Sequence, residues 1–428
     1  MAPARTSPRR RTLASTKEEE SAERTIIESP KKKLAKVVKT KKITAKATVT
    51  TKSPKGSTAT TTQGEITPKK QKLSKGSDTE DSPTKKVKAP KHQVVTTRDP
   101  IPKLWNEDRA RENNSYTFKI ATWNVAGLRG LLTKDPEALK NLCQKHDLDV
   151  LCLQETKLQE SHVTDLKLNL TQHHPIGYDA HYSCSKARKG YSGTAVFVKR
   201  QAVTKQQTTL DSFFQPKTSE KKGKESTKYV PANFDRSLLS PTEILFDMGI
   251  EKHDQEGRMV VLKFPHFTLV NVYVPNSGQK LERLLYRTEE WDVDFLKFMQ
   301  SQPNALWCGD LNVAHTNLEV WNDGAKHLAT QAGVTEQERA SFTHQLETGF
   351  IDVFRHLHPT AAGHYTYWSQ RAGNREPNKG LRLDYFICHP SLLEESSNII
   401  VRDSYMDPEQ MGSDHCPAIV EMEIKATT

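Results

Sequence analysis

Aromatic side chains are absent from the first hundred residues of this 428-residue chain, which contain no Phe, Trp or Tyr. The same stretch carries 25 Lys and Arg against 10 Asp and Glu, a formal charge of +15, whereas the whole chain carries +11 and the remainder therefore −4. A segment with so much charge and so little apolar surface cannot form a core. We predict a disordered, Lys-rich tail over residues 1–114 and a folded domain over residues 115–428.

Cysteine is scarce, at 6 residues, and long apolar runs are missing. No cysteine stands in a CxxC pair or at a metal-like spacing from a histidine, so we expect the reduced thiols of an intracellular protein. No apolar run approaches the ~20 residues that span a bilayer. The first residues, MAPARTSPRRR, lack the apolar stretch of a signal peptide. These absences predict a soluble protein with no membrane partner.

The tail repeats a Ser-Pro or Thr-Pro step followed by basic residues, beginning at Ser7, Ser29, Thr67 and Ser82. One interpretation is a solvated linker. The interpretation we favour is a nuclear-import and non-specific DNA-binding tail, whose charge phosphorylation would lower by about 1.5 to 2 units per site. We therefore expect the protein in the nucleus. A mitochondrial fraction is the alternative, against which two early prolines and the acidic KEEE count.

The apolar pattern changes from about Ser115 onward. Strand-like runs occupy residues 116–125, 149–155, 193–199, 258–276, 304–312, 381–388 and 416–424, and the fourth run turns at Pro265-His266 as an antiparallel pair. Amphipathic helices are expected after Asp135 as N-cap, and after a capping box from Thr335 to Glu338. A third helix over residues 281–299 should turn these side chains inward: Leu281, Leu284, Leu285, Trp291, Phe295 and Phe298. Mixed strands interleaved with helices predict an α/β fold, with helices covering the sheets.

Polar residues recur where the predicted strands end or begin. They are Asn124, Glu155, Tyr273, Asn276, Asp310, Asn312, Asp384, Asp414 and His415. A single buried carboxylate such as Asp310, after the apolar run NALWCG, costs several kcal/mol unless it is paired. One such residue is usually a loop cap, but strand ends that lie side by side would gather acids, amides and an imidazole. Such a cluster can satisfy itself around a divalent cation and a phosphate.

Nine ordered motifs carry a family resemblance: WNVAGLR, LQETK, GYSGT, HDQEGR, VYVPNSG, GDLNVAH, YTYW, RLDYF and GSDHCP. Together they resemble the exonuclease III type of abasic-site (AP) endonuclease, a branch of the endonuclease/exonuclease/phosphatase superfamily. The resemblance implies a four-layered α/β sandwich with two mixed β-sheets packed face to face. It also implies hydrolysis of the phosphodiester 5′ to an abasic site in duplex DNA, which leaves a 3′-hydroxyl, with 3′-phosphodiesterase and 3′–5′ exonuclease side activity in base-excision repair by a monomer.

The resemblance assigns roles to the polar cluster. Asp310 would activate the nucleophilic water with Asn312, two residues along the same strand, and its burial should raise its pKa. Asp384 would orient His415 and favour its charged form, although His415 as the general base is the competing assignment. Tyr273 would contribute to catalysis as a hydrogen-bond donor. Mg²⁺ is the implied cofactor, with Mn²⁺ as the alternative, and its predicted ligands are Glu155, Asn124, Asp414, Asp310, Asn312 and His415.

The DNA contacts follow from the same resemblance. The predicted DNA- or phosphate-binding residues are Asn276, Asn322, Gln279 and Arg371, and the predicted walls of the abasic pocket are Tyr367, Trp368 and Leu381. Leu381 makes the third wall smaller than the aromatic one common in the family, and Gln279 and Arg371 replace the usual Arg and Met wedge. Trp368 in the core is the alternative interpretation.

An insertion at about residues 201–240 interrupts the resemblance. Its Lys-, Thr-, Ser- and Gln-rich sequence predicts a flexible surface loop. Gln207, Leu210, Phe213 and Phe214 match the Q-x-x-[LIM]-x-x-[FY]-[FY] pattern of peptides that bind the sliding clamp PCNA. One helical turn would present the apolar side chains as a plug. The alternative is an amphipathic turn folded onto the protein's own surface.

Two other functions remain open at this point. A phosphatase or lipid phosphodiesterase of the same fold would reuse every catalytic residue but should lack the aromatic pocket. A scaffold that has lost catalysis is disfavoured, because no metal or phosphate position is lost from the motifs.

Overall fold

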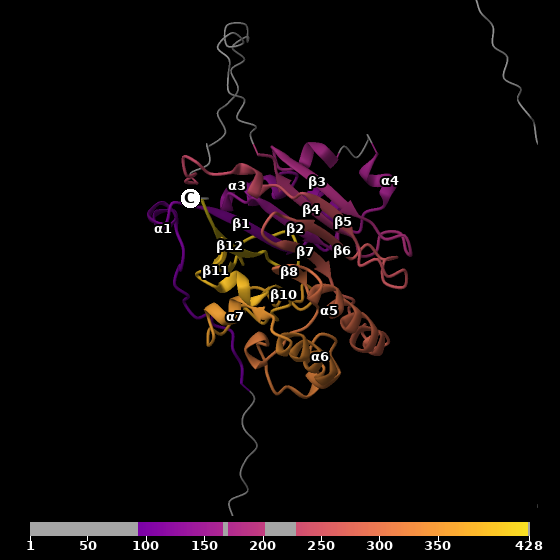
Figure 1. Ribbon diagram of the computed structural model, residues 1–428. Helices are drawn as coiled ribbons and strands as arrows, with labels where there is room; N and C mark the ends of the chain where they lie inside the picture. The colour runs from indigo at the N-terminus through magenta and orange to yellow at the C-terminus, as the bar shows by residue number, and fades with distance from the viewer. Residues whose placement is uncertain (1–92, 166–169, 202–227, 427–428) are drawn as a thin grey trace, which may run out of the picture. The chain divides into compact units, whose positions relative to one another are not determined.

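The computed structural model describes residues 93–165, 170–201 and 228–426 (Figure 1). Most of the predicted tail and the PCNA-like residues 207–214 lie outside the described residues. Within the described part of the chain, no helix is long and apolar enough to cross a membrane. All six cysteines are described, and each is buried with a free thiol, as predicted.

Two six-stranded sheets form the centre of the fold. The first has the order β11 (Ile399–Met406), β12 (Ala418–Lys425), β1 (Ser115–Asn124), β2 (Val150–Gln154), β4 (Thr194–Lys199) and β3 (Tyr178–Ser183). The second has the order β5 (Glu243–Phe246), β6 (Met259–Lys263), β7 (Thr268–Tyr273), β8 (Ala305–Asp310), β10 (Asp384–Cys388) and β9 (Ile351–Asp352). The pairs β1–β2 and β7–β8 are parallel and the others are antiparallel, so both sheets are mixed. The predicted antiparallel pair β6–β7 is confirmed.

Helices cover the outer faces of both sheets. Leucines of α2 (Leu128–Lys134) and α3 (Ala138–His146) pack on the first sheet, and side chains of α5 (Asp292–Gln300) and α6 (Glu336–Glu347) pack on the second. Figure 1 shows the ribbons of α5 and α6 on the side of the second sheet. A separate apolar cluster between the sheets joins side chains of both, such as Phe118 and Leu306. The predicted four-layered α/β sandwich is therefore confirmed. The shorter helices are α1 (Glu107–Glu112), α4 (Glu160–Val163), α7 (Val353–Leu357), η1 (Leu170–His173), η3 (Arg236–Leu239), η4 (Tyr286–Trp291), η5 (Asn317–Glu319), η6 (Lys326–Thr330) and η7 (Pro390–Leu393).

Helix starts agree with the sequence only in part. The capping box of α6 is present, because the Thr335 side chain accepts from the Glu338 N–H and the Glu338 carboxylate accepts from Thr335 N at 3.1 Å. The predicted N-cap Asp135 is wrong, since α3 begins at Ala138 after Glu137. Asp135 instead ends α2, and its Oδ1 accepts from the N–H of Glu137 at 3.2 Å in a turn that delays the helix.

The third predicted helix contains a π-helical turn, η4, directly before α5. Leu285, which we expected inward, is 64% exposed, whereas Arg287 is only 2% exposed. Leu285 stands directly before this turn, whereas Arg287 lies three residues after the buried Leu284 and four before the buried Trp291, so Arg287 shares their inward face. Leu281 lies outside the helix with φ of 59°. Trp291 and Phe295 are buried, as predicted.

The predicted tail is too long at its C-terminal end. Residues 93–105, which we call the strap, lie against the folded domain and lead into α1. Trp105 is 3% exposed and donates its indole N–H to Thr117 Oγ1 at 3.1 Å. Val95 donates its N–H to the carbonyl of Trp321 at 2.7 Å. Trp105 supplies the aromatic anchor that the first hundred residues lack, so the described residues 93–114 belong to the folded domain.

The predicted flexible insertion is also too long. Residues 228–240 contribute buried side chains, and Leu239 is 1% exposed. Lys228 forms an ion pair with Asp149 at 2.5 Å, and Phe234 stacks on Tyr116 with ring centroids 5.2 Å apart. These apolar and paired charged groups fix the stretch that the overall polar composition had assigned to a loop.

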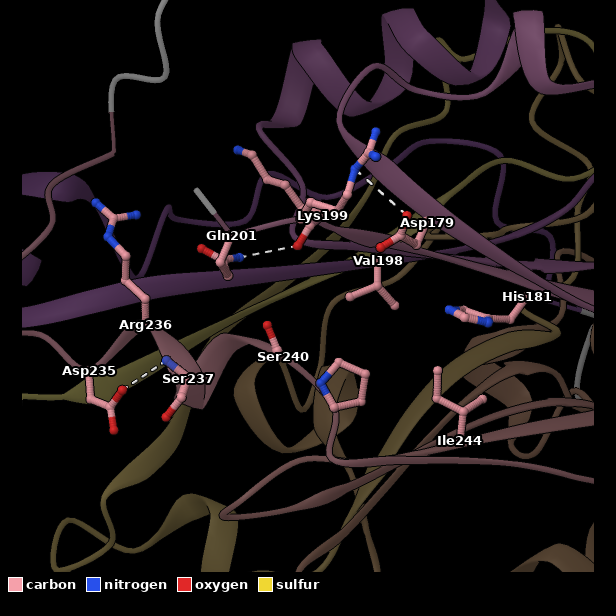
Figure 2. Close-up of a pocket in the computed structure, with 12 residues that line it drawn as sticks. Asp179, His181, Val198, Lys199, Gln201, Asp235, Arg236, Ser237, Ser240 and Ile244 are labelled. Atoms are coloured by element: carbon pink, nitrogen blue, oxygen red, sulfur yellow. Dashed lines mark hydrogen bonds and ion pairs between the residues drawn. The ribbon is translucent and has the colours of Figure 1, made fainter. Parts of the chain in front are cut away.

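A cavity of about 600 Å³ adjoins this stretch (Figure 2). Its lining includes Lys199, Arg236 and Ile244. Lys199 stands at one end of β4, whereas Thr194 at the other end pairs with Gln154, the residue before Glu155. The cavity is therefore at the opposite end of the sheet from the predicted catalytic residues.

Candidate active site

Strand register brings the predicted catalytic residues together. Asp310 ends β8, and it pairs with Tyr273 on one side and with Asp384 on the other. In the other sheet Asn124 ends β1, and Glu155 follows the end of the parallel strand β2. The carboxyl ends of parallel strands meet at one edge of a sheet. Both sheets thus present polar residues at the same end of the sandwich.

Hydrogen bonds join these residues across the two sheets. The Asn124 side-chain amide donates to Asp310 Oδ2 at 2.8 Å and to Glu155 Oε1 at 3.2 Å. The Tyr273 hydroxyl donates to Glu155 Oε1 at 2.8 Å. The polar groups that would be costly alone are therefore mutual partners.

Asp310 is 1% exposed, and its pKa departs strongly from that of a free aspartate. Burial raises the pKa of Asp310 to about 7; the charge of His415 opposes this rise, and the charges of Asp384 and Glu155 add to it. This confirms the expected direction of the shift. A carboxylate with such a pKa accepts a proton from water more readily than an ordinary aspartate does.

Asp384 and His415 form the predicted pair. His415 Nδ1 lies 2.7 Å from Asp384 Oδ2, and its Nε2 lies 3.9 Å from Asp310 Oδ2. Burial lowers the pKa of His415, but the charge and hydrogen bond of Asp384 outweigh burial and raise it to about 10. The imidazole is therefore positively charged at neutral pH, with Nε2 directed towards the side of Asp310.

Local geometry differs from the sequence-based prediction at three positions. Asn312 does not continue the strand, because β8 ends at Asp310 and Asn312 has φ of 49°. Its backbone N–H donates to Asp310 Oδ1 at 2.9 Å, so a tight turn makes the contact that strand alternation was expected to make. Asp384 begins β10, so this strand starts three residues later than the predicted run 381–388. Asp414 and His415 precede the last strand, which starts three residues after His415.

A cleft of about 670 Å³ opens beside this cluster. The predicted residues that line it are Glu155, Asn276, Gln279, Asp310, Asn312, Asn322, Tyr367, Leu381, Asp414 and His415. Asn276 donates its side-chain amide to Asn312 Oδ1 at 2.7 Å. The cleft thus combines the catalytic cluster with residues predicted to contact DNA.

Two predicted DNA-contacting residues are not in the cleft lining. Trp368 is 2% exposed, packs with Tyr365 and Cys416, and donates its indole N–H to Asn378 Oδ1 at 3.1 Å. It is a core residue here, as the alternative interpretation had it. Arg371 is exposed on the surface loop that follows.

The cleft contains an aromatic residue that sequence reasoning missed. Trp321 lines it, and the Lys379 ammonium lies 5.3 Å from the centroid of the indole ring. Trp321 stands in an irregular segment without apolar periodicity, so no pattern assigned it to a wall. Its only signal was an aromatic side chain in a polar loop.

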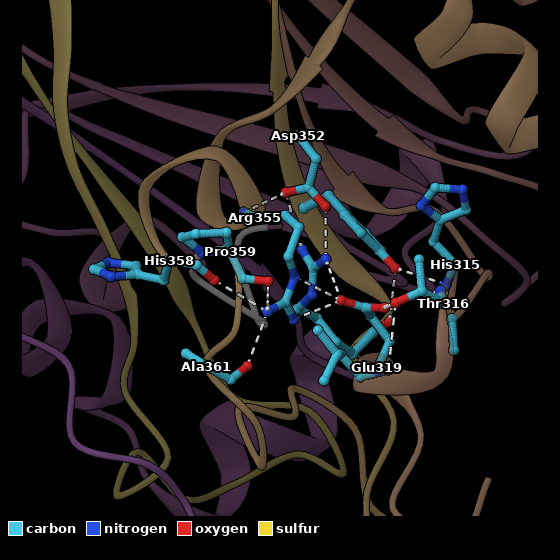
Figure 3. A network of polar contacts seen from close by, with 12 residues as sticks. His315, Thr316, Glu319, Asp352, Arg355, His358, Pro359 and Ala361 are labelled. Atoms are coloured by element: carbon cyan, nitrogen blue, oxygen red, sulfur yellow. Dashed lines mark hydrogen bonds and ion pairs between the residues drawn. The ribbon is translucent and has the colours of Figure 1, made fainter.

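A buried ionic network lies next to the wall of the cleft that Trp321 and Leu381 form (Figure 3). Arg382 pairs with Glu319 at 2.8 Å and with Asp352 at 2.6 Å, and Arg355 pairs with Glu319 at 2.6 Å. Glu319 and Arg382 belong to the two segments that form the wall, and the backbone N–H of Arg382 donates to the carbonyl of Glu319 at 3.0 Å. Removing one partner of such a network costs about 3–5 kcal/mol, so the pairs fix the wall.

Comparison with known proteins agrees with this arrangement. Residues 121–415 match the Endonuclease/Exonuclease/phosphatase family. The chain belongs to this family. A DNA-(apurinic or apyrimidinic site) endonuclease of Dictyostelium discoideum is 35% identical over 323 residues, which cover 74% of this chain and 73% of the relative. An exodeoxyribonuclease of Bacillus subtilis is 37% identical over 304 residues, which cover 70% of this chain and 97% of the relative.

A solved structure extends the agreement to the fold. The crystal structure of an AP endonuclease from Leishmania major has a TM-score of 0.59 and 29% identity, and it covers 76% of this chain and 92% of that one. The chain is thus an endonuclease/exonuclease/phosphatase family member of the exonuclease III type, as its motifs predicted, and it is an enzyme of the hydrolase class.

A divalent metal ion, which membership of this family implies, would find its first donor in the carboxylate of Glu155. Lys157 Nζ lies 2.8 Å from Glu155 Oε2, so a cation already stands against this carboxylate. Burial raises the pKa of Glu155, but Lys157 and hydrogen bonds from Tyr273 and Asn124 lower it below its usual range. Mg²⁺ often uses one or two carboxylates and keeps several waters, so the Glu155 carboxylate with the amide oxygen of Asn124 would suit it.

Five of the six predicted metal ligands line the cleft, and the sixth, Asn124, donates hydrogen bonds to Glu155 and Asp310. Over the described ranges, no three Asp, Glu, His or Cys side chains are gathered to hold a metal ion. His415 is unsuited because Asp384 occupies its Nδ1 and keeps the ring protonated. Glu155 and Asp414 line the cleft and Asn124 bonds Glu155, so these three would suit a metal ion, and the full ligand set stays a prediction.

Proposed function

We propose that this enzyme hydrolyses the phosphodiester bond 5′ to an abasic site in duplex DNA and leaves a 3′-hydroxyl. Removal of blocking groups from 3′ ends and 3′–5′ exonuclease action would be side activities of the same centre. The observation that carries the proposal is Asp310, buried at the floor of the cleft, with a raised pKa and with His415 on one side and Asn124 on the other.

The chemistry assigns each side chain a step. Asp310 accepts a proton from the attacking water, whose oxygen forms the new bond to phosphorus as the bond to the 3′-oxygen breaks. The charged His415 donates a hydrogen bond to the phosphoryl oxygens as negative charge builds on them. Asn312 and Asn276 orient the water and the phosphate. A pKa of about 10 for His415 favours Asp310 over His415 as the proton acceptor.

Mg²⁺ is the cofactor that we propose, with Mn²⁺ as a substitute. When bound at Glu155, Asn124 and Asp414, the ion would supply positive charge that polarises a phosphoryl oxygen. If Glu155 is the principal ligand, Glu155→Ala should raise the Mg²⁺ concentration needed for half-maximal rate. An unchanged metal requirement would count against this ligand.

A nicking assay tests the proposed function directly. A duplex with one abasic site should be cut on its 5′ side in Mg²⁺ and stay intact in EDTA, whereas an undamaged duplex of the same sequence should stay intact in both. Inositol phosphates in a parallel assay address the phosphatase alternative. Turnover of inositol phosphates without DNA nicking would overturn the proposal.

Cellular context is a separate proposal. The tail charge of +15 and its basic clusters favour action in the nucleus as a monomer, and residues 207–214 favour binding to PCNA. Nuclear fluorescence of the full chain, lost when residues 1–92 are removed, would support the first of these.

A further inference from the structure

A buried guanidinium lies behind the loops that carry Asn276 and Asn312. Arg287, in the π-helical turn η4, is 2% exposed. Its Nη1 donates to the carbonyl of Asn312 at 2.8 Å and, more weakly, to that of Pro275 at 3.4 Å, while its Nη2 donates to the carbonyl of Leu311 at 2.7 Å. Buried carbonyls beyond a strand end need donors, and a guanidinium offers five in a rigid fork. One side chain thus satisfies two loops.

Glu338 extends this arrangement to a third part of the cleft wall. It is fully buried at the first turn of α6, and its Oε1 lies 3.9 Å from Arg287 Nη1. Oε1 accepts from the Ser277 hydroxyl at 2.5 Å, and Oε2 accepts from the backbone N–H of Gly333 at 2.7 Å. Gly333 lines the cleft. The two opposite charges therefore connect the loop after β7, the loop after β8 and the segment before α6.

Helical spacing explains why an arginine reaches this place. Arg287 stands three residues after the buried Leu284 and four before the buried Trp291, so it shares their inward face. Asp292, the first residue of α5, lies 3.6 Å from Arg287 Nε and adds negative charge on the side away from the loops. The guanidinium is thereby held from behind and points its Nη donors at the loops.

We infer that Arg287 is a positioning residue for the proposed hydrolysis, on which this inference rests. By fixing the carbonyls of Leu311 and Asn312, it holds the turn whose Asn312 N–H bonds Asp310 Oδ1. The same turn receives the side-chain amide of Asn276. Misplacement of a reacting group by about 1 Å can cost on the order of 10²-fold in rate. Arg287 therefore acts on the transition state through Asn312, without touching the substrate.

The test compares Arg287→Lys with Arg402→Lys. Lysine keeps the charge but cannot donate to two loops in one fixed geometry. Arg402, which is partly buried, pairs with the buried Glu423 at 2.5 Å in the first sheet and does not line the cleft, so its variant controls for the loss of an arginine ion pair away from the site. Both variants are assayed on the abasic duplex well below their unfolding midpoints. We expect kcat to fall about 10- to 100-fold for Arg287→Lys, with KM within about 3-fold, and to stay unchanged for Arg402→Lys.

Each outcome decides the inference. A folded Arg287→Lys with the wild-type kcat overturns it, as does a raised KM with unchanged kcat, which would indicate substrate binding. If Arg287→Lys fails to fold, Glu338→Gln serves as the second variant: it keeps the side-chain shape, weakens the link to Arg287 and should lower kcat in the same selective way. Wild-type protein that does not nick the duplex overturns the proposed function, and the positioning role with it.

Discussion

Burial of Asp310 has two effects: it costs stability, and it raises the pKa of the carboxyl group. An unpaired carboxylate in the core would cost several kcal/mol, but Asn124 and the Asn312 N–H supply two hydrogen bonds to it. These donors do not remove the effect of burial, so the pKa stays at about 7. Asp310 is therefore tolerated in the core because of its hydrogen bonds, and it remains basic enough to accept a proton.

Asparagine substitutions at the two central positions should separate rate from binding. Asp310→Asn and His415→Asn should each lower kcat by a factor on the order of 10² or more, because both groups act mainly on the transition state. Affinity for the abasic duplex, measured by fluorescence anisotropy in Ca²⁺ or EDTA, should change little. Equal losses of affinity and rate would contradict these roles.

The strands differ in how well the sequence predicted them. Runs of apolar residues predicted β1, β6, β7 and β8, because these strands are buried on both faces of their sheets. The short edge strand β5 was missed, since its Leu245 and Phe246 are 37% and 47% exposed and have no clear buried face. Edge strands lack the burial that makes a pattern visible.

Site prediction failed where the chain leaves regular structure. Strand ends identified the Asp310 cluster, because paired polar groups stand out against apolar runs. Trp321 was missed because it lies in an irregular loop, and Arg287 was missed because a charged residue on a helix is expected to face solvent. Trp368 was placed in the pocket by family position, whereas its neighbours Tyr365 and Cys416 enclose it.

The strap should make folding stability sensitive to acid. His364 is 5% exposed, and its Nε2 lies 2.8 Å from the carbonyl of Asp99 in the strap. Burial lowers the pKa of His364 to about 4, although the hydrogen bond to Asp99 opposes this. The unfolded chain, with a histidine pKa of about 6.5, takes up the proton first as pH falls. The contribution of His364 to the free energy of unfolding is therefore complete above about pH 6.5. It is lost as the pH falls towards 4, and it amounts to something on the order of 3 kcal/mol.

Denaturant unfolding at several pH values checks this. His364→Gln, which keeps a donor for the Asp99 carbonyl, should show a smaller fall in unfolding free energy between pH 7 and pH 4 than the wild type. His356→Gln changes an exposed histidine close by in the chain and should behave as the wild type. Identical pH slopes for all three proteins would show that His364 does not bind its proton differently in the two states.

The PCNA-like segment, which lies outside the described residues, gives a prediction of its own. A peptide from Thr204 to Lys224 should bind PCNA in calorimetry, because Leu210, Phe213 and Phe214 would form the apolar plug. In the full chain, Phe213→Ala with Phe214→Ala should abolish PCNA binding and leave nicking of a short duplex unchanged. A double mutant that still binds PCNA, or that unfolds the domain, would return these aromatics to the protein's own surface.

At the scale of the whole molecule, charge divides the chain between its tail and its folded domain. The first hundred residues carry +15 and the rest −4, while the strap, residues 93–105, packs with the folded domain. Removing residues 1–92 should therefore weaken the dependence of DNA affinity on salt, because fewer counterions are released from DNA on binding.

Titrations of DNA binding over a series of salt concentrations test the tail. The truncated protein should give a shallower slope of log affinity against log salt, with unchanged single-turnover nicking at saturating enzyme. A truncation that reaches residue 105 serves as a contrast, since it also removes the strap and Trp105 and should lower thermal stability. An unaltered salt slope would argue that the tail does not touch DNA.

Because Asn124 and Glu155 come from one sheet and Tyr273 and Asp310 from the other, the thickness of the sandwich sets the width of the active site. The side chains between the sheets, such as Phe118 and Leu306, act as spacers for the hydrogen bonds that cross the gap. A core substitution far from the cleft that moves one sheet against the other would change catalysis without touching any catalytic residue. The residues between the sheets therefore set the distances between the catalytic groups, and they influence the reaction rate without contacting the substrate.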